Sequence, residues 1–317
     1  MPMRVVGVDE FGGPDALRVF ELAEGHAGPG EVRLRVHAAA VNPTDTIIRS
    51  GGRAEGERAD PPPQVPGMDA AGVLDEIGDG ATTDLEVGDH VMAIVVPQGS
   101  HGAYGEYVVV PGDSVARTPA GADDVAAATL PMNGLTARLA LDTLDLPPGA
   151  SLAVTGAAGA FGGYVVQLAK ADGLTVIADA APQDEDLVRG LGADVVVGRG
   201  EGVADRIRAV EPDGVDAVAD GALQGGPVAA AVRDGGRFVS VRGYEGDDAS
   251  RTRGVSFHPI MVRGYARERA RLDRLREQVE DGTVTLRVAR TFPAEQASQA
   301  HRTLEAGGTR GRLVLEF

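Results

Sequence analysis

The first third of the chain alternates apolar and polar side chains at the period of a β-strand. The pattern is clearest in Glu31–Ala40, where apolar residues occupy every second position from Val32 to Ala38 and the positions between them are polar. Further short strands are expected at Met3–Val8, Ala70–Ile77, His90–Val96 and Tyr104–Val110. The polar, proline-rich stretch Arg53–Pro66 is typical of a surface loop. Short strands between Gly and Pro turns predict a small barrel or sandwich.

The pattern changes near Ala122. Helical spacing covers Asp123–Leu130 and Gly134–Leu144, and Pro147 and Pro148 then break the chain. The strands expected next are Ser151–Thr155, Thr175–Ala178, Asp194–Val197, Val215–Ala219 and Arg237–Val241, and the helices between them are Phe161–Ala171, Asp184–Leu191, Val203–Val210 and Pro227–Val232. Repeated βα units of this length predict an α/β fold with a doubly wound parallel sheet.

The last part of the chain mixes strands and helices. Pro259–Val262 fits a sixth strand, and it is followed by expected elements at Ala266–Asp281 (helix), Thr283–Ala289 (strand), Pro293–Glu305 (helix) and Arg312–Phe317 (strand). A chain of 317 residues is too long for one ordinary core. We therefore expect two domains, one formed by residues 1–122 and 266–317 and the other by residues 123–265.

A glycine-rich turn between a strand and a helix carries the clearest chemical signal. After the strand that ends at Thr155, the chain reads Ala157-x-Gly159-x-x-Gly162, a dinucleotide-binding fingerprint with Ala in place of the first Gly. Gly159 would let the backbone approach a pyrophosphate, and Gly162 would let the helix pack closely on the strand. The helix N-terminus offers unpaired N–H groups to a phosphate, so Ala158, Gly159, Ala160, Phe161 and Gly162 are the predicted cofactor-binding residues of this turn.

Asp179 ends the second strand of this unit and bears on the choice of nucleotide. An acidic side chain at this point can bond the adenosine ribose and repel a 2′-phosphate, which favours NAD(H). The alternative is that Asp179 faces solvent or caps a turn.

Composition restricts the other chemistry. The net charge of −17 opposes binding to nucleic acid and to anionic lipid. The chain has no cysteine, which excludes disulfides, cysteine nucleophiles and thiolate metal sites. No apolar run approaches the roughly 20 residues that span a bilayer, and no signal peptide is visible, so a cytoplasmic protein is expected.

Several segments, taken in order along nearly the whole chain, resemble the zinc-independent quinone oxidoreductases of the medium-chain dehydrogenase/reductase superfamily. They are Phe11–Pro14, Val41–Gly51, Val65–Val73, Val87–Val91, Gly102–Tyr107, Leu130–Ala137, Leu191–Asp194 and Gly311–Leu315.

The resemblance implies a Rossmann domain, which is 123–265 here, and a GroES-like β-rich catalytic domain, to which the C-terminal segment returns, with the active site between the two. It places Thr136 near the nicotinamide ribose or phosphates, and Ser240, Val241 and Arg242 beside the nicotinamide. It also implies a homodimer, formed through the edge of the Rossmann sheet.

The resemblance further places Asn42, Ile47 and Tyr104 in the substrate pocket. Asn42 and Asp45 are the candidates for a catalytic role, Asn42 as a donor to a developing oxyanion. For Asn42 the alternative is a turn, and for Asp45 it is capping of a following helix, which we favour.

The chain departs from the family pattern at three places. Zinc-dependent relatives carry Gly-His-Glu where this chain has Gly67-Met68-Asp69, so no catalytic zinc is expected. Ile47 stands where related enzymes often carry Tyr. Ala181 and Gln183 stand where NADPH-dependent relatives often carry Ser, Lys or Arg. The family favours NADP(H), and Arg189 or Arg199 could still reach a 2′-phosphate. The local charges favour NAD(H), which stays the alternative.

These observations predict an NAD(P)H-dependent oxidoreductase that transfers hydride to a quinone or an α,β-unsaturated carbonyl without a metal. Two alternatives stay open. One is a non-catalytic NAD(P)H-binding redox sensor, and the other is a dedicated enoyl or ketone reductase of a biosynthetic pathway.

Overall fold

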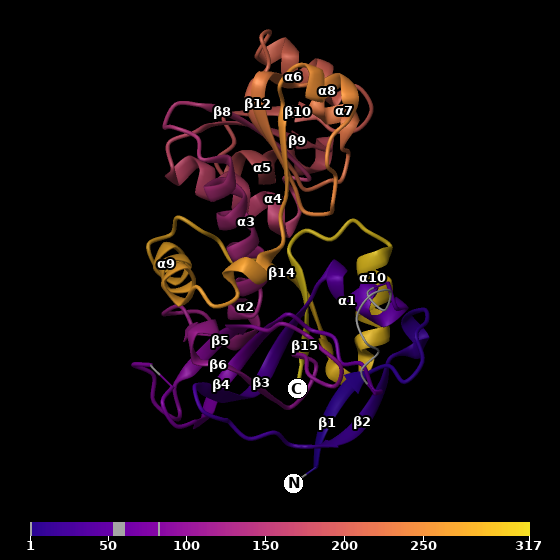
Figure 1. Cartoon of the computed structure of the whole chain (residues 1–317), viewed down its shortest axis with the longest axis vertical. Helices are drawn as coiled ribbons and strands as arrows, with labels where there is room; N and C mark the ends of the chain where they lie inside the picture. Colours follow the sequence, from indigo (N-terminus) through magenta and orange to yellow (C-terminus); the bar gives the residue numbers. More distant parts are fainter. Residues whose placement is uncertain (1, 53–60, 82) are drawn as a thin grey trace. The chain divides into compact units, whose positions relative to one another are not determined.

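The computed structural model describes residues 2–52, 61–81 and 83–317. The chain divides into two compact units (Figure 1). Unit 1 comprises residues 1–132, 263–281 and 286–317, and unit 2 comprises residues 133–262 and 282–285. The change of sequence pattern near Ala122 lies inside unit 1, because the helix that follows it, α2 (Asp124–Ala127), packs against strands of that unit.

Unit 2 contains a six-stranded parallel sheet, as the βα repeats predicted. Its strands are β8 (Ser151–Thr155), β9 (Thr175–Ala180), β10 (Val195–Gly198), β11 (Val215–Asp220), β12 (Val232–Ser240) and β13 (Ser256–Pro259), in the order β10-β9-β8-β11-β12-β13. Strand order reverses beside β8, and in such sheets ligands bind at the carboxyl ends of the strands at that point.

Helices pack on this sheet because the connections between parallel strands must cross its faces. The connections contain α4 (Ala160–Ala171), α5 (Glu185–Gly190), α6 (Val203–Val210), α7 (Gly226–Ala229) and α8 (Asp248–Thr252), and α3 (Pro131–Leu144) precedes β8. α4 contacts β8, β9 and β11, whereas α7 contacts β11 and β12. The core between sheet and helices is made of small side chains such as Ala153, Val218 and Ala229, together with Phe238.

Unit 1 is built on a mostly antiparallel sheet. In the described residues its strands are β3 (Glu31–Val41), β4 (Asp69–Ile77), β5 (His90–Ile94), β6 (Tyr107–Pro111), β7 (Val115–Arg117), β14 (Val288–Pro293) and β15 (Arg312–Glu316), in the order β14-β15-β3-β4-β5-β7, with β6 also paired to β3. A separate hairpin joins β1 (Pro2–Gly7) to β2 (Arg18–Ala23). The helices are α1 (Pro43–Ser50), α2, α9 (Arg269–Glu280) and α10 (Ala297–Glu305).

The C-terminal segment completes the sheet of unit 1, as the resemblance implied. β15 lies antiparallel to β3, with Leu313 opposite Val41 and Leu315 opposite Ala39. Figure 1 shows this yellow segment beside the indigo and purple strands of the N-terminal part. Two elements that are distant in sequence thereby share one apolar core, to which Leu34, Leu315 and Phe292 belong.

Several predicted boundaries were wrong where pairing across the chain decides the structure. Thr283–Ala289 was expected as a strand and Pro293–Glu305 as a helix, but β14 runs on to Pro293 because it pairs with β15, and α10 starts at Ala297. The sixth strand of the parallel sheet is Ser256–Pro259, N-terminal to the predicted Pro259–Val262. Of the predicted loop Arg53–Pro66, residues 53–60 lie outside the described part of the chain.

The turn from β8 into α4 requires glycine at two positions. Gly156 has φ +67°, a left-handed conformation that favours glycine. A Cβ on Gly162 would lie 2.4 Å from the carbonyl oxygen of Gly156, so a side chain there would push the first turn of α4 away from the strand.

We predict that Gly162→Ala lowers the free energy of unfolding by about 2 kcal/mol or more, because the backbone of Gly156 has no room to move away from the new methyl group. Gly190→Ala is the matched control, since a Cβ on Gly190 in α5 meets nothing within 4 Å. It should be neutral or stabilising by about 0.5 kcal/mol. Urea unfolding of both variants tests this, and equal stability of the two would contradict it.

Candidate functional site

The glycine-rich turn of unit 2 stands at the carboxyl end of β8, where the predicted cofactor site begins. Gly159 is the N-cap of α4, and its N–H donates to the carbonyl oxygen of Gly156 at 2.9 Å. Ala160, Phe161 and Gly162 form the first turn of α4. The N-terminus of this helix therefore follows directly on the turn, which is the arrangement that suits a phosphate group.

Asp179 lies at this turn and does not face solvent. It is 4% exposed, and its Oδ1 accepts from the N–H of Gly156 at 2.7 Å and of Ala157 at 3.3 Å. Burial raises the pKa of Asp179, and those two N–H groups and the nearby Arg199 guanidinium oppose the rise. The carboxylate thus fixes the loop that precedes α4. Of the alternatives predicted for Asp179, exposure to solvent is wrong, and capping of a turn agrees with these two hydrogen bonds. Contact of Asp179 with the adenosine ribose stays a prediction.

A second carboxylate holds the neighbouring strand end. Asp220, the last residue of β11, accepts from the Thr155 hydroxyl at 2.6 Å and from the N–H of Gly225 at 2.8 Å. The ends of β8 and β11 are thereby tied together beside the point where strand order reverses.

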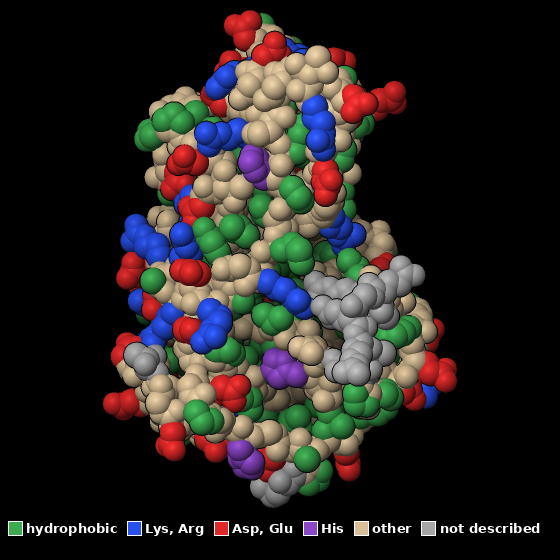
Figure 2. All heavy atoms as spheres, viewed as in Figure 1, with side chains coloured by type: hydrophobic (Ala, Val, Ile, Leu, Met, Phe, Trp, Pro, Cys, Tyr) green, Lys and Arg blue, Asp and Glu red, His purple; other side chains and the backbone are tan. Residues whose placement is uncertain are grey.

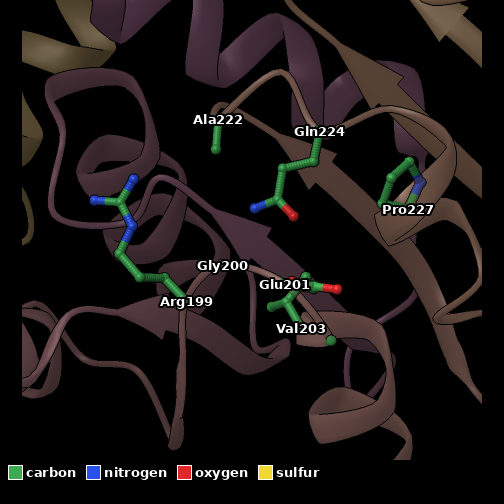
Figure 3. Close-up of a pocket in the computed structure, with 8 residues that line it drawn as sticks. Arg199, Gly200, Glu201, Val203, Ala222, Gln224 and Pro227 are labelled. Carbon is green, nitrogen blue, oxygen red and sulfur yellow. The ribbon is translucent and has the colours of Figure 1, made fainter.

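An open pocket of about 440 Å³ lies beside these strand ends in unit 2. It is lined by Arg199, Gly200, Glu201, Gly202, Val203, Ala222, Gln224 and Pro227 (Figure 3). Figure 3 shows the Gln224 amide pointing into the space between Arg199 and Glu201. The amide nitrogen of Gln224 lies 3.5 Å from Oδ2 of Asp179, so the pocket adjoins the glycine-rich turn.

The remaining predicted cofactor residues also belong to unit 2. Thr136 lies in α3 and is 8% exposed. Ser240 is the last residue of β12, and its hydroxyl donates to the carbonyl oxygen of Tyr244 at 3.3 Å. Val241 and Arg242 follow it in the chain. Their contact with a nicotinamide, like that of Thr136, stays a prediction.

Unit 1 contains a second cluster, a buried network of polar side chains around the end of β3. We call it the buried polar network, and its members are Asn42, Asp45, Arg49, Asp69, Tyr104, His301 and Arg312. Asn42 follows β3 directly and precedes α1, whose first residue, Pro43, is well suited to a helix N-terminus. Its side-chain amide donates to Asp69 at 2.7 Å, and its side-chain oxygen accepts from Arg312.

The two buried carboxylates of the network bind backbone N–H groups from distant segments. Asp45 accepts from the N–H of Asn42 at 2.7 Å and of Gly67 at 3.0 Å. Asp69 accepts from the N–H of Met132 at 2.6 Å. Asp45 thus caps α1, as favoured from the sequence, and it also holds the loop that contains Gly67.

Tyr104 and His301 extend the network towards the surface. The Tyr104 oxygen lies 3.1 Å from Oδ2 of Asp45 and 3.1 Å from Nε2 of His301, and Nδ1 of His301 lies 3.3 Å from Arg49. Arg49 also pairs with Glu305 at 2.6 Å. Because Arg49 can only donate, Nδ1 of His301 accepts, Nε2–H donates to Tyr104 and the Tyr104 hydroxyl donates to Asp45.

Burial sets the protonation of this network. It raises the pKa of Asp45 to about 7 and that of Asp69 to about 6, against the hydrogen bonds to both and the Arg312 charge beside Asp69. It lowers the pKa of His301 to about 3, helped by the Arg49 charge. His301 is therefore neutral at pH 7, and burial favours the protonated form of Asp45 more than in a solvent-exposed aspartate.

Asn42, Asp45 and Tyr104 are fully buried, and the structure gives them a structural role in unit 1. Ile47 is half-buried on α1. Contact of these residues with a substrate stays a prediction. Sequence reasoning missed Asp69, Arg49 and Arg312 as members of the network, and Asp220 and Gln224 in unit 2. The sequence showed only that these polar residues lie at strand ends or in mostly apolar stretches. It did not show which residues they would bind.

The residues at the position of the family's catalytic zinc do not fit that metal. Met68 is a thioether in place of a histidine, and the chain has no cysteine. The carboxylate of Asp69 is already held by Met132 and Asn42.

Two family models match different parts of the chain. Residues 28–120 match the family described as alcohol dehydrogenase GroES-like domain, and residues 191–315 match the family described as zinc-binding dehydrogenase. A 2-haloacrylate reductase from Burkholderia sp. is 31% identical over 334 residues, covering 97% of both chains. Polyketide synthase GfsB of Streptomyces halstedii is 33% identical over 299 residues, and this chain spans 5% of its length.

Solved structures show the same fold. The quinone oxidoreductase from Coxiella burnetii has a TM-score of 0.86 at 27% identity and covers 100% of both chains. A mycobacterial protein complexed with NADPH has a TM-score of 0.86 at 27% identity, covering 99% of this chain and 100% of the other.

The raised pKa of Asp45 predicts the sign of a pH effect on stability. Its folded value of about 7 lies above the ordinary 3.8, so this group stabilises the fold below pH 3.8, and the contribution is lost as pH rises to about 7. Over this range the free energy of unfolding of wild type should fall, relative to that of Asp45→Asn, as pH rises. Urea unfolding at a series of pH values measures this difference.

Asp248→Asn on the exposed surface is the control and should keep the wild-type pH dependence. A difference between wild type and Asp45→Asn that stays constant with pH would contradict the prediction.

Proposed function

Since the chain belongs to the medium-chain dehydrogenase/reductase superfamily and is quinone oxidoreductase-like within it, we propose that it transfers hydride from NAD(P)H to a quinone or an α,β-unsaturated carbonyl without a catalytic metal. The observation that carries the proposal is the turn from β8 into α4, with Asp179 holding the loop and the N-terminus of α4 directly after it. Met68 and Asp69, at the position of the family's zinc ligands, support the metal-free part.

Bound NAD(P)H would supply the hydride from its nicotinamide ring. The residues of this chain would hold and orient it: the amides of Ala160 and Phe161 beside the pyrophosphate, and Thr136 and Ser240 nearer the nicotinamide. Quinones and enones spread the charge that develops after hydride transfer over a carbonyl group. A reductase of such acceptors therefore needs positioning and a dry site more than a Lewis acid.

The buried polar network supports this function by fixing α1 and the loop at Gly67. Asn42 and Asp45 follow the end of β3, and their hydrogen bonds hold the start of α1 beside that strand and Asp69. Ile47, on the same helix, is half-buried, and we propose that it lines the substrate pocket.

We propose NADP(H) as the preferred cofactor and NAD(H) as the alternative. Asp179 directs Oδ1 inward to the glycine-rich turn, and the pocket beside it presents the Arg199 guanidinium. A guanidinium at this place suits a 2′-phosphate. The mycobacterial relative complexed with NADPH supports the same choice.

The first test of the function is the rate of oxidation of NADPH and NADH, side by side, with a panel of quinones and enones. We expect turnover with at least one acceptor and a higher kcat/KM for NADPH. Binding of cofactor without turnover of any acceptor would overturn the proposal and favour a redox sensor. Turnover restricted to one enoyl or ketone substrate would favour a dedicated biosynthetic reductase, to which the similarity to a polyketide synthase points.

The second test concerns Arg199. We predict that Arg199→Gln raises the KM for NADPH about tenfold, the equivalent of one charged hydrogen bond, and leaves the KM for NADH nearly unchanged. Arg189→Gln is the matched control, since Arg189 lies on α5 in a long contact with Glu185. Equal losses for both cofactors in Arg199→Gln, or a selective loss in Arg189→Gln instead, would contradict the assignment.

We propose a cytoplasmic homodimer that pairs through an edge strand of the parallel sheet, which is β10 or β13. Among the described residues, no helix is long and apolar enough to cross a membrane. On the face in Figure 2, acidic and basic side chains are interspersed, which together with the charge of −17 supports small-molecule over nucleic-acid partners.

A further inference from the structure

Two histidines and one aspartate from three elements of unit 1 converge on the surface of its sheet. Nδ1 of His37, on β3, lies 2.7 Å from Oδ2 of Asp124, and Nδ1 of His90, on β5, lies 2.9 Å from its Oδ1. The potential ligand atoms of all three lie within 4.8 Å of one another, and no other such group of three or more occurs in the part of the chain that the structure describes. We call it the His37–His90–Asp124 cluster.

The local structure brings these side chains together across an intervening strand. β3 and β5 both pair with β4, and the register of β3 shifts between Val36 and Ala38, at His37. A Cβ on Gly72 of β4 would lie 2.1 Å from a carbonyl oxygen of β3, so glycine is needed for the two strands to approach there. The two imidazole rings have centroids 6.2 Å apart and an edge-to-face orientation.

Asp124 is held over the two strands by the start of α2. The Asp123 side chain caps this helix by accepting from the N–H of Ala126 at 2.7 Å, and α2 contacts β3, β4 and β5. The side chain of Asp124 is 12% exposed, whereas those of His37 and His90 are 36% and 59% exposed. The cluster is therefore anchored on one side and open to solvent on the other.

Two imidazole nitrogens and one carboxylate are a ligand set for borderline divalent transition metals. Ligands at about 2.1 Å in tetrahedral geometry stand roughly 3.4 Å apart. The present separations of 2.7 and 2.9 Å need to open by well under 1 Å, and the exposed His90 ring can move by that amount. The open side leaves room for water to complete the coordination.

We propose that the His37–His90–Asp124 cluster binds a divalent transition metal ion of the zinc type. The site is separate from the position of the family's catalytic zinc, because it shares no residue with Met68, Asp69 or the buried polar network. Its effect is structural: the ion would join α2 to β3 and β5, and α2 directly precedes the long helix α3. The proposal does not depend on the proposed reductase activity.

The test is metal binding by the untagged, metal-stripped full chain. Co²⁺ should produce visible d–d absorption bands, and Zn²⁺ should displace it and raise the midpoint of thermal unfolding. His37→Gln, His90→Gln and Asp124→Asn should each weaken binding at least about tenfold. His26→Gln is the matched control, since His26 is an exposed histidine paired with a single carboxylate, that of Glu76, and it should bind Co²⁺ like wild type.

Absence of Co²⁺ bands in wild type, with no Zn²⁺ effect on thermal unfolding, would overturn the proposal and leave the cluster as a hydrogen-bonded group. Binding that survives in the double variant His37→Gln, His90→Gln would overturn it as well. Circular dichroism of each variant distinguishes loss of the site from loss of the fold.

Discussion

The structure of unit 1 depends on hydrogen-bond donors that reach two fully buried carboxylates. Asp45 and Asp69 are 0% exposed, and a buried carboxylate without donors would cost several kcal/mol. The donors come from Asn42, Gly67, Tyr104 and Met132, so the end of β3, the loop before β4 and the start of α3 must all be in place before the carboxylates are satisfied. One electrostatic constraint thereby fixes segments that share no local sequence.

Unit 2 uses the same device at its parallel sheet. Asp179 and Asp220 accept hydrogen bonds at strand ends, and the donors include three backbone N–H groups of the loops that follow β8 and β11. These hydrogen bonds restrict the loop beside the proposed phosphate site, and a rigid site lowers the cost of binding. Both units therefore use buried aspartates to hold backbone in place.

The glycine-rich turn could be predicted because its signal is local. The strand, the glycine spacing and the helix from Ala160 all lie within one short stretch of sequence. The partners of Asp179 could not be predicted, since Gly156 and Ala157 are 23 and 22 residues away and the contact depends on how β9 pairs with β8. Pro293 was misassigned to a helix for a similar reason, because its pairing with β15 is not visible in the local pattern.

The pairing of β15 with β3 has a consequence for how the chain is made. Arg312 contacts Asn42 across a separation of 270 residues, and the antiparallel sheet of unit 1 is incomplete until the final strand has been synthesised. Unit 2 is nearly continuous, so we expect it to fold first on the ribosome while the earlier-made strands of unit 1 wait without their last partner. We therefore expect the order of folding to differ from the order of synthesis, with the early strands of unit 1 exposed to misassembly until β15 pairs with β3.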